Sequence, residues 1–186
     1  ALPDRPSQRE LVLEQRKEII RAYYASTTLM DACVGRILDG LEKLELNDNT
    51  IVIFLSDHGY HLGHHGLWQK SDLFEGSTRV PFIISVPRMK TAGQTSSSLT
   101  ELVDLYPTLA ELCNLPKPPH LKGHSLVSVL KNPKHNVRKA AFSTTRIRPR
   151  LPGLTGKVRP LGRSIRTIRY RYTEWNEGKH GVELYD

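Results

Sequence analysis

The side chains best suited to chemistry lie in one short stretch, residues 56–70. Asp57 and His58 stand side by side in it, and Lys70 follows Asp57 by 13 residues. A carboxylate offers a hard oxygen and an imidazole offers a nitrogen, so the pair can bind one divalent cation. The compact ammonium of Lys70 can then reach an anionic group held by that cation. The pattern predicts metal-assisted chemistry on an anionic substrate group.

Three further histidines, His61, His64 and His65, follow in the same glycine-rich stretch. With His58 they form a cluster that could bind Zn²⁺, because imidazole is a good zinc ligand. Zinc sites made of histidine alone on such a loop are uncommon, so we expect these three side chains on the loop surface. Gly59 is expected to let the backbone turn sharply after the Asp-His pair.

Other polar and aromatic residues near this stretch have a simpler structural interpretation. Glu75 and Arg79 could contact substrate, but an ion pair that braces the loop is favoured. Trp68 either lines a substrate pocket or packs within the loop, and the sequence favours neither. Tyr23 and Tyr24 are expected in the core, since aromatic residues on a helix face are usually buried.

Two apolar, β-branched segments must position the reactive stretch. Thr50 to Ser56 predicts a strand buried on both faces of a parallel or mixed sheet, and Val80 to Val86 predicts a second strand entered at Pro81. The polar segment from Asp57 to Thr78 lies between them and is expected to be a loop. A loop at the carboxyl end of a buried strand is where open α/β sheets place their chemistry.

The rest of the chain predicts helices first and an antiparallel tail last. A capping box at Ser7 starts a helical pattern that reaches Leu44, as one helix or as two with a break near Ser26 to Thr28. The later expected elements are a turn at Asn47 to Asn49, a helix capped by Asp104 that carries Leu105 to Leu112, a helix from Ser125 to Leu130, strands at Ala140 to Thr145 and Ser164 to Trp175, a loop from Arg146 to Gly162, a turn at Asn176 to Gly178, and a strand at Val182 to Tyr185.

Composition limits the class of protein. The 186 residues carry a net charge of +8 and are 38% hydrophobic, which suits one domain or one domain with an appendage. Apolar runs reach about five residues, far below the roughly 20 of a membrane span. Residues 131–171 hold 13 Lys and Arg and no Asp or Glu, so this basic segment could attract a polyanion. No GxSxG, P-loop or GxGxxG motif supports a serine hydrolase, an NTPase or a dinucleotide enzyme.

Seven sequence blocks occur in order along the chain: Tyr23-Tyr24-Ala25; Met30-Asp31 with Val34-Gly35-Arg36-Ile37-Leu38; Asp48-Asn49-Thr50-Ile51-Val52 with Ser56-Asp57-His58-Gly59; Gly66-Leu67-Trp68-Gln69-Lys70 with Ser77-Thr78-Arg79-Val80-Pro81; Asp104-Leu105-Tyr106-Pro107-Thr108-Leu109; Gly123-His124-Ser125-Leu126; and Arg166-Thr167 with Arg169-Tyr170-Arg171-Tyr172 and Glu183-Leu184-Tyr185-Asp186. Together they resemble the sulfatase family of the alkaline phosphatase superfamily, in particular its iduronate-2-sulfatase branch. His64 departs from the family pattern, which often has Glu there.

The resemblance implies a role for each reactive residue. Asp57 and His58 would be metal ligands, usually for Ca²⁺, with Mg²⁺, Mn²⁺ or Zn²⁺ as alternatives. Lys70 would contact the sulfate and stabilise its charge as the S–O bond breaks. The nucleophile of such enzymes is a formylglycine made from the Cys of a C-x-P-S-R-like motif. Neither Cys33 nor Cys113 lies in one. The nucleophile and the paired aspartates that complete the metal site are therefore expected in an N-terminal part that this chain lacks.

The resemblance also implies a fold and a function. The expected fold is α/β: the C-terminal part of an alkaline-phosphatase-like mixed-sheet sandwich at residues 1–130, then an incomplete, basic antiparallel subdomain at 131–186. The expected protein is a fragment of a sulfuric ester hydrolase for sulfated saccharides such as glycosaminoglycans, inactive without its N-terminal part. We expect export to the periplasm, a lysosome or the cell exterior, no membrane span and no nucleic-acid partner.

Alternatives remain open at this point. A phosphodiesterase or phosphonate hydrolase of the same superfamily would use the same three residues, and the missing nucleophile would distinguish it. A non-catalytic polyanion-binding module built on the basic segment is a second alternative. At the residue level, Asp57 could cap the loop, His58 could bond to backbone, and Lys70 could be a solvated lysine.

Overall fold

The computed structural model describes residues 11–70, 72–146 and 160–186. They form two compact units, one of residues 11–70 with Phe74–Arg88 and one of residues 72–73 with Met89–Asp186. The expected helix start at Ser7 and nearly all of the expected loop from Arg146 to Gly162 lie outside the described residues. The predicted boundary between residues 130 and 131 falls inside the second unit, and it stays a prediction.

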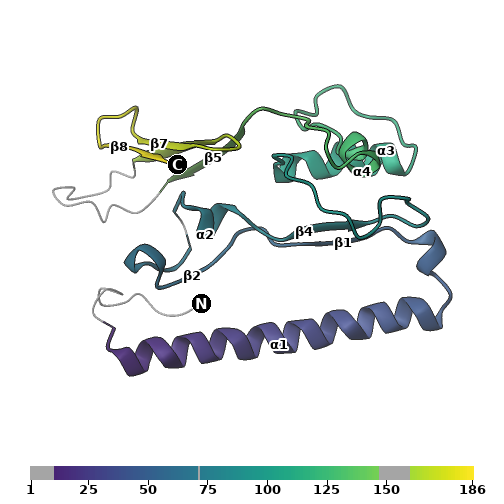
Figure 1. Cartoon of the computed structure of the whole chain (residues 1–186), viewed down its shortest axis with the longest axis horizontal. Coiled ribbons are helices and arrows are strands. Elements are labelled where there is room, and N and C mark those ends of the chain that lie inside the picture. Colours follow the sequence, from purple (N-terminus) through teal and green to yellow (C-terminus); the bar gives the residue numbers. More distant parts are fainter. Residues whose placement is uncertain (1–10, 71, 147–159) are drawn as a thin grey trace. The chain divides into compact units, whose positions relative to one another are not determined.

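The first unit opens with one long helix, α1 (Leu13–Lys43), drawn in purple and blue in Figure 1. The helix continues through Ser26 to Thr28, where each hydroxyl donates to the carbonyl four residues earlier, at 2.9–3.0 Å, and so keeps a partner inside the helix. The question of one helix or two is thereby settled. The prediction that Tyr23 and Tyr24 are core residues is wrong, since they are 38% and 62% exposed. Tyr23 instead packs on Tyr60, with ring centroids 5.3 Å apart.

A short 3-10 turn, η2 (Asn47–Asn49), leads into β1 (Val52–Leu55), which pairs with β4 (Phe82–Ser85). The pairing is antiparallel, from Val52 opposite Ser85 to Leu55 opposite Phe82, so of the expected parallel or mixed sheet it fits the mixed kind. All four residues of β1 are only half-buried, which corrects the expected burial on both faces. The intervening chain returns to the end of β1 that it left, so β4 must run back alongside it. The entry of β4 after Pro81 is confirmed.

The segment between β1 and β4 is more ordered than the predicted loop. It holds a small antiparallel hairpin of β2 (His61–Leu62) and β3 (Trp68–Gln69), joined by the 3-10 turn η3 (His64–Gly66). A four-residue helix, α2 (Glu75–Thr78), follows. The pairing sets His61 opposite Gln69 and Leu62 opposite Trp68, so the hairpin presents two different faces.

The second unit begins with η4 (Leu102–Asp104) and α3 (Leu105–Leu112), and α4 (Val127–Lys131) follows. Asp104 holds the N-cap position of α3, as predicted, but its side chain makes no cap hydrogen bond to that helix. Its carboxylate accepts from the backbone N–H of Glu101 at 2.9 Å and of His124 at 2.7 Å, and it pairs with Arg138. Asp104 is fully buried, and its side chain ties three segments together.

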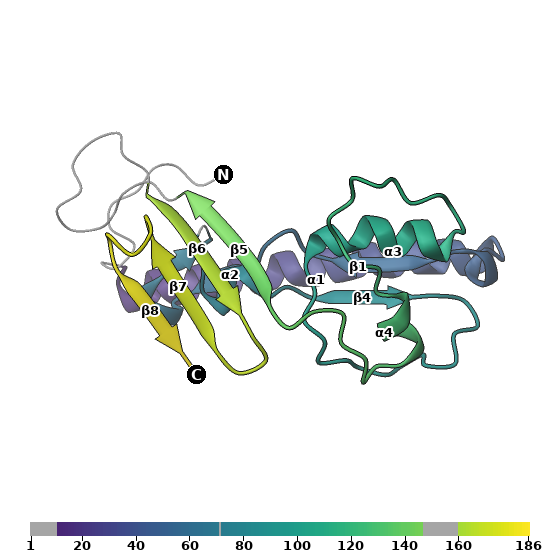
Figure 2. The ribbon, with the colours of Figure 1, turned by 90° about the horizontal axis from the view of Figure 1, so that it is seen from above.

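Four strands complete the second unit as an antiparallel sheet in sequence order: β5 (Ala141–Arg146), β6 (Leu161–Arg166), β7 (Arg171–Trp175) and β8 (Val182–Tyr185) (Figure 2). The single strand expected from Ser164 to Trp175 is two strands. The N–H of Thr167 donates to Tyr170 O at 2.8 Å, and the Thr167 hydroxyl oxygen accepts from Tyr170 N at 2.9 Å. A threonine thus closes this turn, without the glycine or proline that would mark it in the sequence.

The expected turn before β8 is confirmed, and Asn176, Glu177 and Gly178 all have positive φ. The mixture of helices and antiparallel strands, ending in a small antiparallel sheet, agrees with the predicted fold class. Among the helices of the described ranges, none combines the length and the apolar character that a bilayer crossing requires.

Candidate active site

The candidate site begins where β1 ends, at Asp57 and His58. The imidazole Nδ1 of His58 lies 2.9 Å from the carbonyl oxygen of Gly59. A carbonyl only accepts hydrogen bonds, so Nδ1 carries the ring proton and Nε2 keeps its lone pair. The loop backbone thus holds the histidine in the tautomer that a metal ligand needs.

Lys70 approaches the same ring from the far end of the hairpin. Its Nζ lies 2.5 Å from His58 Nε2, and Asp57 Oδ2 lies 3.4 Å from that nitrogen. The ammonium donates and Nε2 accepts, which agrees with the tautomer set by the backbone. The Asp57 side chain is 83% exposed and the His58 side chain 36%, so both face open space. The structure brings the three predicted residues together, and their roles as ligands stay predictions.

The backbone around these residues explains their convergence. The Ser56 hydroxyl donates to His58 O at 2.7 Å, and His58 N donates to Asp57 Oδ1 at 3.0 Å, so the strand end is fixed locally. Gln69, directly before Lys70, has φ 77°, a left-handed value that costs a non-glycine residue free energy. This strained residue redirects the chain at the point where β3 delivers Lys70.

Gly59 has a different role from the expected one. Its φ is not positive, so it makes no left-handed turn. Its N–H donates to Ser77 O at 2.9 Å, and a β-carbon at residue 59 would lie only 2.1 Å from Gly76 O. Glycine is therefore required for close contact between the strand end and α2, not for a sharp bend.

The other histidines of the stretch differ among themselves. His64 and His65 are exposed, as expected, and His65 stacks on Phe74 at 4.2 Å between ring centroids. His61 was also expected on the surface, and this is wrong: it is 1% exposed and packs against Gly76, where a β-carbon would come within 2.5 Å of the ring. Among the described residues, no group of three or more His, Cys, Asp or Glu converges as a metal site.

The donor set at the strand end suits a divalent cation in part. Asp57 offers carboxylate oxygens, and His58 Nε2 lies 3.4 Å from one of them. A cation such as Ca²⁺ takes six to eight ligands, so these residues would supply only some of them. The residues present therefore fit a metal whose coordination needs further donors.

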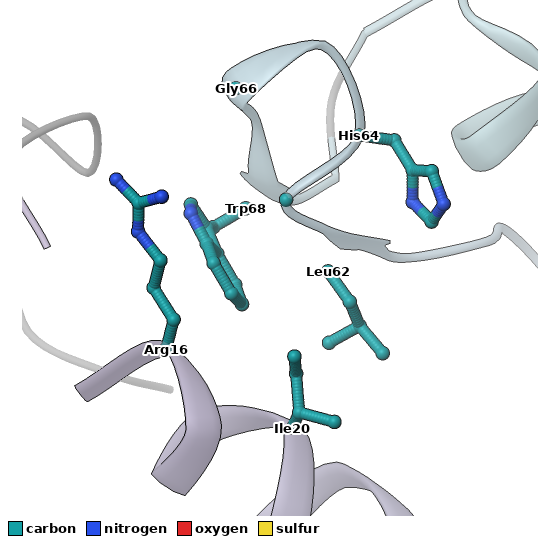
Figure 3. Close-up of a pocket in the computed structure, with 7 residues that line it drawn as sticks. Arg16, Ile20, Leu62, His64, Gly66 and Trp68 are labelled. Atoms are coloured by element: carbon teal, nitrogen blue, oxygen red, sulfur yellow. The ribbon is translucent and has the colours of Figure 1, made fainter. Parts of the chain in front are cut away.

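Trp68 is 8% exposed, and its ring lies close to Gly63, where a β-carbon would be 3.3 Å from it. It packs within the loop, and it also lines an open pocket of about 540 Å³ between the hairpin and α1 (Figure 3). Arg16 and Ile20 of α1 face this pocket, and neither was predicted as a site residue. Their spacing of four residues, about one helical turn, places both side chains on one face of α1, and this was the signal that the sequence offered. The expected ion pair between Glu75 and Arg79 stays a prediction.

Four arginines of the basic segment make internal contacts within the described residues. Arg138 pairs with Glu101 and Asp104, and Arg171 is 7% exposed. Arg171 donates to Leu73 O and to Ser164 Oγ, both at 3.0 Å. Two more arginines lie beside carboxylates: Arg163 near Glu174 at 3.7 Å and Arg169 with Asp186 at 2.6 Å.

Comparison with known proteins identifies the family. The sulfatase family model matches residues 3–115, and the model of the C-terminal part of N-sulphoglucosamine sulphohydrolase matches residues 63–186. Iduronate 2-sulfatase of Mus musculus is 32% identical over 211 aligned residues, which cover 86% of this chain and 38% of that protein. The chain thus spans well under half of this relative's length.

Solved structures agree with this result. One, in complex with its substrate D-glucosamine-2-N,6-O-disulfate, is 31% identical with a TM-score of 0.81, covering 92% of this chain and 34% of the other. The phosphonate monoester hydrolase of Agrobacterium radiobacter is 29% identical with a TM-score of 0.80, covering 95% and 36%. These similarities confirm the predicted fold class, the C-terminal part of an alkaline-phosphatase-like fold. The chain belongs to the sulfatase family.

Proposed function

We propose that this chain supplies part of the active site of a sulfuric ester hydrolase that acts on sulfated saccharides, in the iduronate-2-sulfatase-like branch. The observation that carries the proposal is the convergence of Lys70 and Asp57 on one nitrogen of His58, at 2.5 and 3.4 Å. The bond from Lys70 to His58 spans 12 residues of the chain and argues against a solvated lysine, while Asp57 also caps the loop by accepting from His58 N. The disulfated glucosamine bound by one structural relative supports a saccharide substrate.

In this proposal Asp57 and His58 hold a divalent cation, with Ca²⁺ favoured and Mg²⁺, Mn²⁺ or Zn²⁺ as alternatives. Such a cation, when bound, polarises the sulfate as a Lewis acid. The N–H donated from His58 Nδ1 to Gly59 O keeps the ring proton off Nε2, which accepts from Lys70 in this structure and would exchange that bond for the cation. Lys70 donates its N–H groups to the sulfuryl oxygens and stabilises their charge as the S–O bond breaks.

The nucleophile is proposed to come from outside this chain. Cys33 lies in α1 and Cys113 at the end of α3, and neither sequence context fits a formylglycine motif. The 186-residue chain by itself is therefore expected to hydrolyse no sulfate ester. Its partner would be the N-terminal part of a sulfatase, which would carry the formylglycine and the remaining metal ligands, and the whole protein would be exported.

Paramagnetic broadening tests the metal site on the chain as it exists. Mn²⁺ broadens amide NMR signals close to its binding site even when binding is weak. We expect it to broaden the signals around Asp57 and His58, and we expect the loss of this effect in Asp57→Ala and His58→Ala. His135→Ala in the second unit is the matched control, and it should leave the broadening unchanged. Broadening that persists in both site variants would contradict the proposal.

A phosphonate hydrolase is the second candidate function, because one structural relative of TM-score 0.80 is a phosphonate monoester hydrolase. Lysine and a divalent cation serve phosphoryl and sulfuryl oxygens alike, so the described residues suit both. Titration with sulfate and with phenylphosphonate, followed on the Lys70 side-chain signals, compares them directly. Tighter binding of the phosphonate would favour this second function.

The polyanion-binding alternative has less support. Arg138, Arg163, Arg169 and Arg171 all contact acceptors within the described residues. Cations that already have internal partners contribute little to counterion release on a polyanion.

A further inference from the structure

The pocket beside the β2–β3 hairpin is separate from the three proposed site residues but lies on the same segment of chain. Its walls come from Arg16 and Ile20 on α1 and from Leu62, His64 and Trp68 on the hairpin. We propose that this pocket binds an anionic saccharide unit that adjoins the one carrying the ester to be cleaved. The inference rests on the proposed function and names a second contact with the same substrate.

The apolar side of the pocket suits the carbon face of a sugar ring. Leu62 and Trp68 are opposite each other in the hairpin register, so both side chains lie on one face of it. Figure 3 shows this face turned toward α1, with Leu62 pointing at Ile20. Ligand sites commonly combine such an apolar or aromatic wall with a few polar groups that fix orientation.

Arg16 supplies the polar group. Its side chain extends from α1 alongside Trp68 (Figure 3), and its Nε donates to Leu11 O at 2.8 Å. Within residues 11–70, 72–146 and 160–186, no carboxylate pairs with its guanidinium. The next residue, Lys17, is by contrast paired with Glu14 at 2.9 Å. A guanidinium fork beside an apolar wall can bind a carboxylate or sulfate in two places at once.

The chain itself connects this pocket with the proposed site. Trp68 precedes Lys70 by two residues, so their Cα atoms lie at most about 7 Å apart. Lys70 in turn contacts His58. A sulfated oligosaccharide could therefore place one sulfate near Lys70 and an adjoining anionic unit against Arg16. The site would then select a substrate by the saccharide unit next to the one that carries the ester.

Tryptophan fluorescence gives a direct test, because the chain has two tryptophans and Trp175 lies on β7. In a Trp175→Phe background the emission reports Trp68 alone. The probe is a heparin-derived disaccharide that carries both a carboxylate and sulfates. We expect a saturable change in emission, and we expect Arg16→Met to weaken the affinity about tenfold to a hundredfold. Lys17→Met, which removes an already paired cation on the same helix turn, should leave it unchanged.

Several results would overturn the inference. Equal affinity in Arg16→Met, equal affinity for an uncharged disaccharide, or the same response to inorganic sulfate alone would each exclude an anionic sugar site here. Arg16→Lys, which keeps the charge but not the fork, gives an intermediate affinity if the proposal holds and guards against misfolding of the methionine variant. Asp57→Ala should leave the Trp68 response intact while it removes Mn²⁺ broadening. Absence of that broadening in the unmodified chain, with the Trp68 response retained, would overturn the proposed function but support the pocket.

Discussion

The backbone of Gly59 lies against Gly76, so that a β-carbon on residue 59 would be 2.1 Å from the Gly76 carbonyl oxygen. This contact joins the end of β1 to α2, and a second bond, from Gly59 N to Ser77 O, reinforces it. The position of His58 depends on the same backbone, because its ring donates to the carbonyl of Gly59.

Gly59→Ala should therefore damage both the first unit and the site. We expect the free energy of unfolding to fall by about 1–3 kcal/mol, since a methyl group must displace backbone, and Mn²⁺ broadening near His58 to weaken. Gly35→Ala in α1 is the matched control, because nothing lies within 4 Å of its added β-carbon. That variant should be neutral or more stable in urea denaturation, as alanine favours helix. If Gly59→Ala and Gly35→Ala changed the free energy of unfolding equally, the contact between Gly59 and Gly76 would not be what requires glycine at residue 59.

Removal of the Lys70 ammonium tests the anion-binding half of the proposed site. Lys70→Met should weaken sulfate binding by about tenfold or more, because a charge-assisted hydrogen bond contributes about 1.5–3 kcal/mol. NMR titration of the chain with sodium sulfate measures it, and Lys43→Met at the end of α1 controls for the loss of one positive charge. Sulfate affinity that does not change in Lys70→Met would remove this residue from the site.

The proximity of Asp57, His58 and Lys70 was predictable because the relevant signal was local, while their roles stay predictions. An apolar run followed at once by Asp57 and His58 marks a strand end, and a hairpin returns Lys70 to it. Features that depend on tertiary contact were not predictable. The buried state of His61 depends on Gly76, and the requirement for glycine at residue 59 depends on its distance from α2.

The differences in secondary structure have the same origin. A parallel or mixed sheet leaves the pairing of β1 with β4 open, and its antiparallel sense follows from the path of the intervening chain, which periodicity does not encode. The turn between β6 and β7 depends on a threonine side chain. The alternation of apolar and polar residues therefore runs through it in the sequence without a glycine or proline to indicate a turn. Arg16 could not be predicted as a pocket residue, because Trp68, which lines the pocket with it, lies 52 residues further along the chain.

Asp104 should be the most sensitive polar residue of the second unit. It is fully buried, accepts from two backbone N–H groups, and pairs with Arg138. Asp104→Ala should lower the free energy of unfolding by about 3–5 kcal/mol, because it leaves a buried cation and two donors without that acceptor. Urea denaturation measures the loss. Glu111→Ala removes a carboxylate from an exposed pair in the same unit and should cost less than about 1 kcal/mol. Similar costs for the two variants would contradict this account of the network.

Glu111 offers a test of electrostatics by pH. A hydrogen bond from Lys117 is the main cause that lowers the pKa of Glu111 below its ordinary value of 4.5, and Ser125 adds to it. Because the folded-state pKa is the lower one, the ionised carboxylate stabilises the folded chain above about pH 4.5, and this contribution disappears as the pH falls through the lowered pKa.

Lys117→Met should therefore move the NMR titration midpoint of the Glu111 carboxyl carbon upward, toward 4.5. The stability difference between the variant and the unmodified chain should be small at neutral pH, since the pair is exposed, and should vanish under acid conditions. Lys90→Met, an exposed lysine elsewhere in the unit, controls for the change in net charge. A midpoint that stays in place in Lys117→Met would assign the lowered pKa to Ser125 instead of to the lysine.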